Sequence, residues 1–192
     1  MCHAHSPSER AVIRPAADTD IDAIQAILRA NRSDPSLFQQ PREQICRTLA
    51  DFLVAADERG HVIGCTALRR DDAAWGEILA VAVDPAVHGR GVGSALVRAA
   101  VQRARESGVC RIWLGSAKPA YFARLGFRPI SRWTLPLSTL WRKLRLVLQQ
   151  PPSRWLPAIL GRHRFMALEL ADRHRRGAGR QKQMLSVPQV PD

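Results

Sequence analysis

An apolar strand that runs into a glycine-rich turn and then a helix constrains the fold of this chain more than any other feature. Its residues are Leu79-Ala80-Val81-Ala82-Val83, the stop Asp84-Pro85, and the turn His88-Gly89-Arg90-Gly91-Val92-Gly93-Ser94. Glycine lets the backbone approach a ligand closely, and the first N–H groups of a helix are unpaired and carry partial positive charge. The segment therefore predicts a phosphate-binding site at a helix N-terminus.

Two common phosphate-binding loops do not fit this segment. A Walker loop needs Gly-Lys-Ser/Thr after its second glycine, and the segment contains no lysine. A dinucleotide-binding turn needs a third glycine where this chain has Ser94. It also needs an acidic residue at the end of the next strand, and Arg111–Leu114 contains none. A third kind of phosphate loop has to be considered.

Hydrophobic periodicity and turn residues divide the rest of the chain into short elements. They predict a first helix that ends at Ala30, further helices over 42–50, 91–107 and 119–125, and strands over 11–14, 52–56, 61–69, 75–83, 111–114, 126–130 and 164–170. Three strands linked by hairpins therefore precede a strand–helix–strand crossover. This order predicts an α/β (α+β) fold with a mixed sheet flanked by helices, and argues against a purely parallel one.

The glycine-rich segment resembles motif A of the GNAT superfamily of N-acetyltransferases. That motif reads Gln/Arg-x-x-Gly-x-Gly/Ala after a Leu-x-Val strand, and here His88 takes the first place while Gly91 and Gly93 take the glycine places. A second family element, an aromatic followed by Leu-Gly-Phe, is matched by residues 121–127. The resemblance covers residues 11–130 and 164–170. It implies a mostly antiparallel mixed sheet of six to seven strands.

The resemblance also implies a co-substrate and a place for it. Acetyl-CoA would lie where the strands Trp75–Val83 and Arg111–Leu114 splay apart, and no metal would be needed. Backbone groups of Val81 and Val83 would hold the pantetheine arm. The pyrophosphate would be held by the loop residues His88, Gly89, Arg90, Gly91, Val92, Gly93 and Ser94. The acceptor would be a primary amine of a small molecule or of a protein.

Acetyl transfer needs a base for the amine and a proton for the leaving thiolate. Glu77 is the acidic residue of its strand, and we take it as the candidate base, with a salt-bridged edge residue as the alternative interpretation. In the resembled family, a tyrosine five residues before the phenylalanine of Gly-Phe protonates the thiolate. Phe122 stands there in this chain, and Tyr121 lies about 100° around the helix axis. Tyr121 on a shifted helix, Ser116 and solvent remain the candidates for this proton.

The charge of the chain is unevenly distributed. Residues 1–106 carry 13 Lys/Arg and 14 Asp/Glu, whereas residues 107–168 carry 11 Lys/Arg and no acidic residue. Within this basic half, apolar residues from Leu137 to Leu148 repeat at helical spacing, with Arg142, Lys143 and Arg145 between them. A lid on the core, a pocket wall that selects an acidic acceptor, and a helix on an anionic membrane surface are all open interpretations. Nucleic-acid binding is a further one.

The domain organisation follows from these elements. We expect a flexible N-terminus over 1–10, one acetyltransferase domain over 11–170 with a basic helical insertion at 131–163, and a disordered basic tail over 171–192. The cysteines Cys2, Cys46, Cys65 and Cys110 lack the spacing of metal ligands, so we expect reduced thiols in a cytoplasmic protein. Because Phe122 replaces the family tyrosine, a non-catalytic acyl-CoA-binding module is the alternative to an enzyme.

Overall fold

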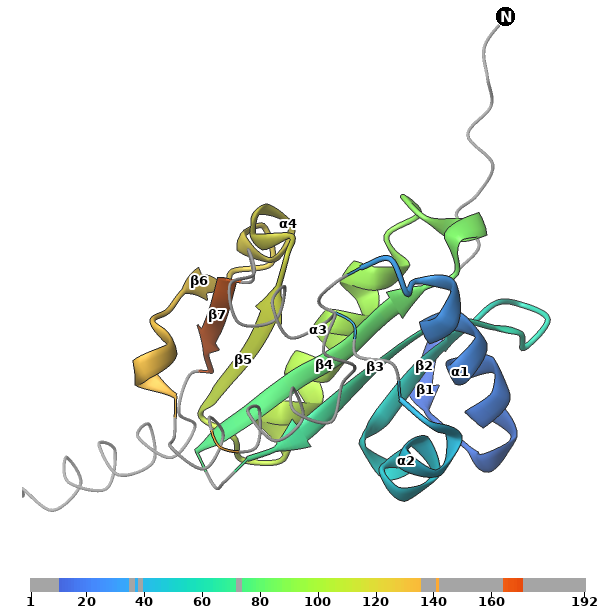
Figure 1. Cartoon of the computed structure of the whole chain (residues 1–192), viewed down its shortest axis with the longest axis horizontal. Helices are drawn as coiled ribbons and strands as arrows, with labels where there is room; N and C mark the ends of the chain where they lie inside the picture. Colours follow the sequence, from blue (N-terminus) through green and yellow to red (C-terminus); the bar gives the residue numbers. More distant parts are fainter. Residues whose placement is uncertain are drawn as a thin grey trace, which may run out of the picture.

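The fold is a seven-stranded mixed sheet flanked by helices, as the sequence predicts (Figure 1). The computed structural model describes residues 11–34, 37, 40–71, 74–135, 141 and 164–170. The strands lie in the order β1-β2-β3-β4-β5-β7-β6, and only β4 and β5 are parallel neighbours. The strands are β1 (Val12–Pro15), β2 (Phe52–Ala56), β3 (Val62–Arg70), β4 (Trp75–Val83), β5 (Arg111–Ser116), β6 (Arg128–Pro129) and β7 (Arg164–Glu169). The helices are α1 (Ile21–Ala30), α2 (Arg42–Arg47), α3 (Val92–Glu106) and α4 (Pro119–Ala123), with 3-10 turns at Asp18–Asp20, Leu49–Asp51, Pro85–Val87 and Arg132–Thr134.

Two apolar cores lie on opposite faces of the sheet, because successive side chains of a strand point to opposite faces. On one face, Val97 and Ala100 of α3 pack against Leu68 and Ile78. On the other face, α1 and α2 pack against Phe52 and other buried residues of β2 and β3. Figure 1 shows α1 and α2 together at the β1–β2 side, and α3 on the opposite face beneath β3 and β4. The crossover from β4 to the parallel strand β5 therefore runs through α3 on this face.

Most element boundaries differ from those predicted by one or a few residues, and three of the differences have a clear local cause. The helix predicted over 42–50 ends at Arg47, because the Thr48 hydroxyl donates back to the Gln44 carbonyl at 2.8 Å and the chain then tightens into a 3-10 turn. β5 extends to Ser116, since its ladder with β7 continues to that residue. β6 is shorter than predicted: the N–H of Phe127 is used to close α4, through Phe122 O at 3.1 Å.

The entrance to α1 is pinned to β1 by Asp20, a carboxylate that is 4% exposed. Arg14 donates to both of its oxygens, at 2.6 and 2.9 Å, and the Ala17 N–H donates at 2.8 Å. The hydrogen bonds from Arg14 hold the pKa of Asp20 below its ordinary value of 3.8, against the opposing effect of burial. A lowered pKa means that the carboxylate stabilises the fold above that ordinary value, and that this contribution is lost as the pH falls through the folded-state pKa.

We expect Asp20→Asn to lower the free energy of unfolding by about 2 kcal/mol at neutral pH, because charge-assisted hydrogen bonds are lost. Urea unfolding at a series of pH values should show the difference in the free energy of unfolding between the two proteins. This difference should become smaller as the pH falls below the range in which carboxyl groups ordinarily titrate. Asp22→Asn is the matched control. Asp22 is 81% exposed in its pair with Arg42, so its replacement should change little. Equal losses in the two variants would contradict the assigned role of Asp20.

The predicted flexible N-terminus, most of the predicted insertion and the predicted basic tail lie outside the described residues. Of the insertion, 131–135 and Trp141 are described. None of the helices in the described part of the chain is both long and apolar enough to cross a membrane.

Candidate functional site

The two parallel strands separate beyond a short ladder. β4 and β5 pair only from Trp75 to Glu77 on one strand and from Arg111 to Trp113 on the other. Past that point they diverge toward their carboxyl ends, and Figure 1 shows the opening between them. A parallel sheet offers its ligand sites at the carboxyl ends of its strands, where neighbouring strands part. The opening therefore lies where the sequence analysis expected the co-substrate.

A bulge in β4 accompanies the separation. Cys65 pairs with Ala82 but Ala67 pairs with Leu79, so Thr66 faces two residues of β4. Ala80, one of these two, has φ of +55°, which costs energy for a residue with a side chain. The Thr66 hydroxyl donates to Leu79 O at 3.2 Å from the neighbouring strand. A bulge bends its strand and leaves backbone groups outside the ladder, and here these groups face the opening.

The glycine-rich loop lies at the carboxyl end of β4. The Asp84 side chain caps the 3-10 turn by accepting from the Ala86 N–H at 2.9 Å, which directs the chain toward the loop. Gly89 and Gly91 have φ of +82° and +81°, conformations that favour glycine. The first N–H bonded within α3 is that of Ala95, which donates to Gly91 O at 3.0 Å. Helix geometry directs the N–H groups of the preceding turn outward, toward a ligand.

The Val83 carbonyl joins this loop to α1. The Asn31 amide donates to it at 2.9 Å, and the His88 Nε2 lies 2.9 Å from the same oxygen. In the tautomer that carries its proton on Nε2, His88 donates this bond. Both lone pairs of the Val83 carbonyl oxygen are then engaged. The pantetheine contacts expected of Val81 and Val83 must therefore use their other backbone groups.

One cavity of about 570 Å³ unites the opening and the loop. Most of the residues predicted for the site line it, and Arg90, which is exposed, does not. The predicted residues that line it are Glu77, Val81, Val83, His88, Gly89, Gly91, Val92, Gly93, Ser94, Ser116 and Tyr121. Asn31, Asp34 and Lys118 also line it, and the sequence analysis did not foresee them. Its residues come from both sides of the β4–β5 opening.

Glu77 lies at the inner end of the cavity and is 1% exposed. It forms an ion pair with Arg69, its neighbour in the β3–β4 register. Asp71 is also nearby: its Oδ1 lies 4.0 Å from Arg69 Nε, and its Oδ2 accepts from Trp113 Nε1 at 2.8 Å. An opposite charge at ion-pair distance offsets part of the cost of burying a carboxylate. The arrangement thus combines both interpretations of Glu77, a salt-bridged residue and a carboxylate within the cavity.

The two other candidates for proton transfer, Tyr121 and Ser116, and the residue at the family's tyrosine position, Phe122, point in different directions. Phe122 is 7% exposed and belongs to the core on the α3 face. Tyr121 turns toward α3, and its hydroxyl lies 3.1 Å from Ser94 Oγ. Ser116 is 4% exposed, and its Oγ accepts from the Lys118 N–H at 2.9 Å. Since Ser116 accepts this bond, its own proton can be donated to a ligand in the cavity.

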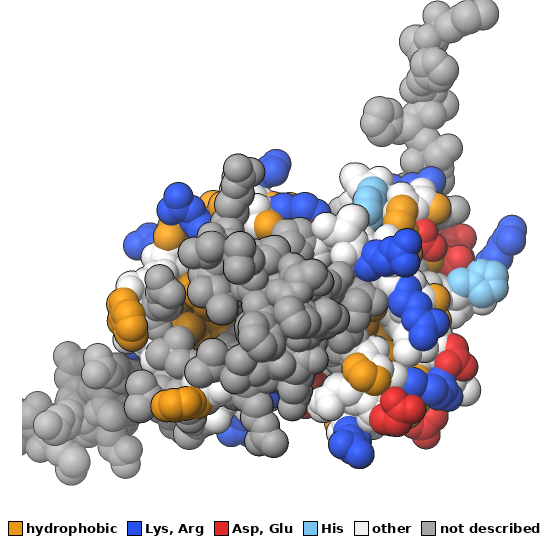
Figure 2. All heavy atoms as spheres, in the orientation of Figure 1, with side chains coloured by type: hydrophobic (Ala, Val, Ile, Leu, Met, Phe, Trp, Pro, Cys, Tyr) orange, Lys and Arg blue, Asp and Glu red, His pale blue; other side chains and the backbone are white. Residues whose placement is uncertain are grey.

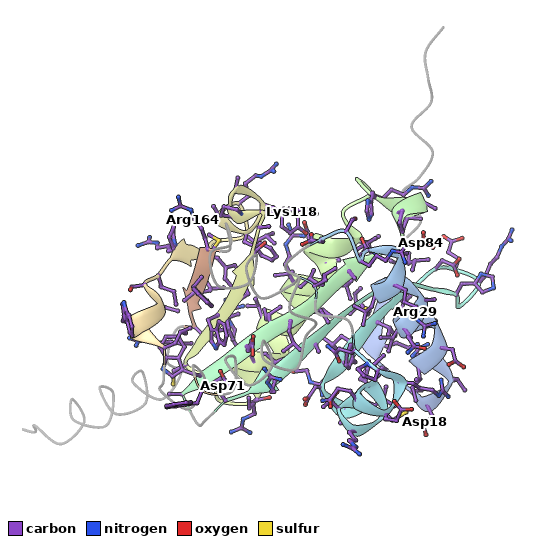
Figure 3. All side chains as sticks on the ribbon, viewed as in Figure 1. Asp18, Arg29, Asp71, Asp84, Lys118 and Arg164 are labelled. Carbon is purple, nitrogen blue, oxygen red and sulfur yellow. The ribbon has the colours of Figure 1, made fainter. Side chains whose placement is uncertain are left out.

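Charged side chains surround the mouth of the cavity. Lys118 Nζ pairs with Asp34 Oδ2 at 3.0 Å, which links the turn before α4 to the segment after α1. Figure 3 shows Lys118 and Asp84 at the loop end of the opening and Asp71 at the opposite end of β4. In Figure 2, Asp and Glu lie among Lys and Arg on the α1 and α2 side, while the α4 and β6 side shows Lys and Arg. The unequal charge of the two halves of the sequence is therefore visible on the folded surface.

Comparisons with known proteins agree on one family. The family model described as Acetyltransferase (GNAT) family matches residues 21–127. The amino-acid acetyltransferase of Mycobacterium tuberculosis is 34% identical over 123 residues, which cover 63% of this chain and 70% of that protein. The Mycobacterium tuberculosis protein Rv2747, solved in complex with CoA, is 29% identical with a TM-score of 0.69, over 83% of this chain and 99% of that one.

A second solved structure is the N-acetylglutamate synthase of Neisseria gonorrhoeae, in complex with coenzyme A and N-acetyl-glutamate. It is 25% identical to this chain, with a TM-score of 0.64. The match covers 84% of this chain but only 35% of the synthase, so this chain corresponds to about a third of that enzyme.

Proposed function

Because the chain belongs to the GNAT family of acetyltransferases and uses acetyl-CoA as its co-substrate, we propose that this N-acetyltransferase acetylates the α-amino group of an amino acid. The observation that carries the proposal is the β4–β5 opening, which joins a phosphate-binding loop to a buried carboxylate in one cavity. Two relatives, named as an amino-acid acetyltransferase and an N-acetylglutamate synthase, support an amino acid as the acceptor.

In the proposed complex, the backbone holds the co-substrate. The outward N–H groups between Gly89 and Ser94 bind the pyrophosphate, where the α3 dipole adds partial positive charge. The pantetheine arm runs into the opening along the bulged part of β4, and backbone groups of Val81 and Val83 bind its amides. The thioester then lies toward Glu77 at the inner end of the cavity.

The proposed reaction is a direct transfer. The neutral amine nitrogen attacks the thioester carbonyl carbon, a C–N bond forms, and the C–S bond breaks to release the CoA thiolate. The second N–H proton, which is lost as the amide forms, passes through solvent to the thiolate. Glu77, the ion-pair partner of Arg69, takes the proton that the acceptor's ammonium group loses before the attack. The Ser116 hydroxyl donates a hydrogen bond to the departing thiolate. A thiolate is a good leaving group, so a hydrogen bond from Ser116 is enough to stabilise it. A tyrosine at the position of Phe122 is therefore not required.

Two finer assignments belong to the same proposal. An acidic side chain on the acceptor is favoured by Lys118 and Arg124, which line the cavity. The residues Arg142, Lys143 and Arg145, from which an acidic acceptor was also inferred, lie outside the described part of the chain.

A cytoplasmic location is supported by the free thiols of Cys46, Cys65 and Cys110, because that compartment keeps thiols reduced.

An acceptor screen tests the acceptor class. Release of CoA thiol from acetyl-CoA is measured with each amino acid and with the amine obtained by removing its α-carboxylate. We expect kcat/KM to be on the order of 100-fold higher for a preferred amino acid than for its decarboxylated amine. The polar groups of the site that bind the α-carboxylate have no partner when the amine is bound. Equal values for every such pair would contradict an amino-acid acceptor.

A further inference from the structure

Tyr121, the one tyrosine of the chain, is not used by the reaction proposed above. Its neighbour Phe122 packs edge-to-face against it, with ring centroids 5.0 Å apart, and against Phe127, with centroids 5.9 Å apart. These contacts fix Phe122 in the core and leave the Tyr121 ring on the side of α4 that faces α3. The hydroxyl of Tyr121 is thus held away from the core by the packing of its own ring.

The Tyr121 hydroxyl lies on the first turn of α3. It is 3.1 Å from Ser94 Oγ, and a Cβ atom placed on Gly93 would lie 2.9 Å from it. Gly93 therefore makes room for the hydroxyl, and Ser94 holds it in position. All three residues line the cavity, so the hydroxyl is on the ligand side of the helix. Tyr121 reaches this turn from α4, across the opening from the loop.

We propose that Tyr121 is a side-chain donor of the phosphate site, whose O–H hydrogen-bonds the pyrophosphate of CoA. The first turn of α3 supplies N–H donors and partial positive charge from one side of the opening. The phenol supplies one more donor from the other side. A hydrogen bond from a neutral hydroxyl to a charged oxygen is stronger than one between neutral groups, and no second charge has to be desolvated.

The inference rests on the proposed co-substrate site and adds to it a residue outside the glycine-rich motif. It also separates Tyr121 from the chemistry. The thioester sulfur lies a whole pantetheine arm away from the pyrophosphate, so a hydroxyl bound at the start of α3 does not reach the leaving thiolate. Tyr121 is accordingly a binding residue, and its removal should act on CoA affinity through the phosphates.

The test compares Tyr121→Phe with the wild-type chain by calorimetry, using CoA and pantetheine as ligands. Pantetheine has the same arm but lacks the pyrophosphate. We expect the Kd for CoA to rise about tenfold and the Kd for pantetheine to stay within error. Phenylalanine keeps the ring contact with Phe122, so the fold should survive. Ser94→Ala, which removes the partner of the hydroxyl but leaves the backbone N–H, should give a smaller loss in CoA affinity.

Three outcomes would overturn the inference. An unchanged Kd for CoA would show that the hydroxyl does not contact the phosphates. An equal loss for CoA and pantetheine would place the contact on the arm. A kcat whose pH profile loses its alkaline limb, with the CoA Kd unchanged, would make Tyr121 the acid for the thiolate. Failure of the wild-type chain to bind CoA would instead contradict the proposed co-substrate site itself.

Discussion

Replacing Gly93 with glutamate should raise the Kd for CoA at least about 100-fold while the chain stays folded. Gly93 is in the first turn of α3, and its Cβ position lies 2.9 Å from the Tyr121 hydroxyl. A glutamate there brings a negative charge to the N–H groups that bind the pyrophosphate and displaces the tyrosine. A carboxylate near a helix N-terminus does not harm the helix, so the loss should appear in binding and not in stability.

Two controls separate charge from position in this experiment. Gly93→Ala introduces the steric contact with Tyr121 but no charge, and the atom it contacts is the far end of a side chain that can move. We therefore expect it to weaken CoA binding much less. Ser107→Glu adds the same charge at the exposed C-terminal end of α3 and should leave CoA affinity unchanged. Wild-type CoA affinity in a folded Gly93→Glu protein would refute the loop assignment.

Glu77→Gln should lower kcat by about 100-fold or more near neutral pH, because a general base contributes this much to proton transfer. Glutamine keeps the size of the side chain and an oxygen for Arg69, but it cannot accept the proton. Raising the pH increases the fraction of bound acceptor whose amine is already neutral, so part of the lost rate should return under alkaline conditions. The pH profile of kcat with a saturating acceptor measures both effects.

Arg69→Gln is the matched control for Glu77. It breaks the same ion pair but keeps the carboxylate, and urea unfolding reports what the pair contributes to stability. If Glu77 is the base, Arg69→Gln should retain more activity than Glu77→Gln at a similar loss of stability. If Glu77 is only structural, Glu77→Gln will keep the wild-type kcat and pH profile in the fraction that stays folded.

Much of the fold follows from local patterns in the sequence. The apolar run before Asp84 and the glycine-rich turn predicted the strand β4, the start of α3 and the crossover between them. Gly89 and Gly91 have the positive φ values that their residue type allows. Short apolar runs bounded by turn residues predicted the remaining strands, since each is part of a sheet with a buried face. Among the described residues, errors in these predictions are confined to element ends, as at Thr48, where a side-chain hydrogen bond accompanies the early end of α2.

The parts of the site that were not predicted depend on contacts between distant elements. Alanine has no preference for φ of +55°, so the bulge at Ala80 arises from pairing with β3 and leaves no mark in the local sequence. The partnership of Glu77 with Arg69 needs the register of β3 and β4. The direction of the Tyr121 hydroxyl is decided by the packing of Phe122 in the core. Residue spacing along one helix could indicate only that Tyr121 and Phe122 face different ways.

One measurement tests the central claim most directly. The chain is incubated with acetyl-CoA carrying an isotopic label in its acetyl group and with the preferred acceptor from the screen. The account predicts one labelled acetyl group on the α-nitrogen for each CoA thiol released, and neither product with Gly93→Glu. Release of CoA thiol without a labelled acetyl group on the acceptor would contradict acetyl transfer from this site. So would binding of acetyl-CoA with no release of CoA thiol in the presence of any amine.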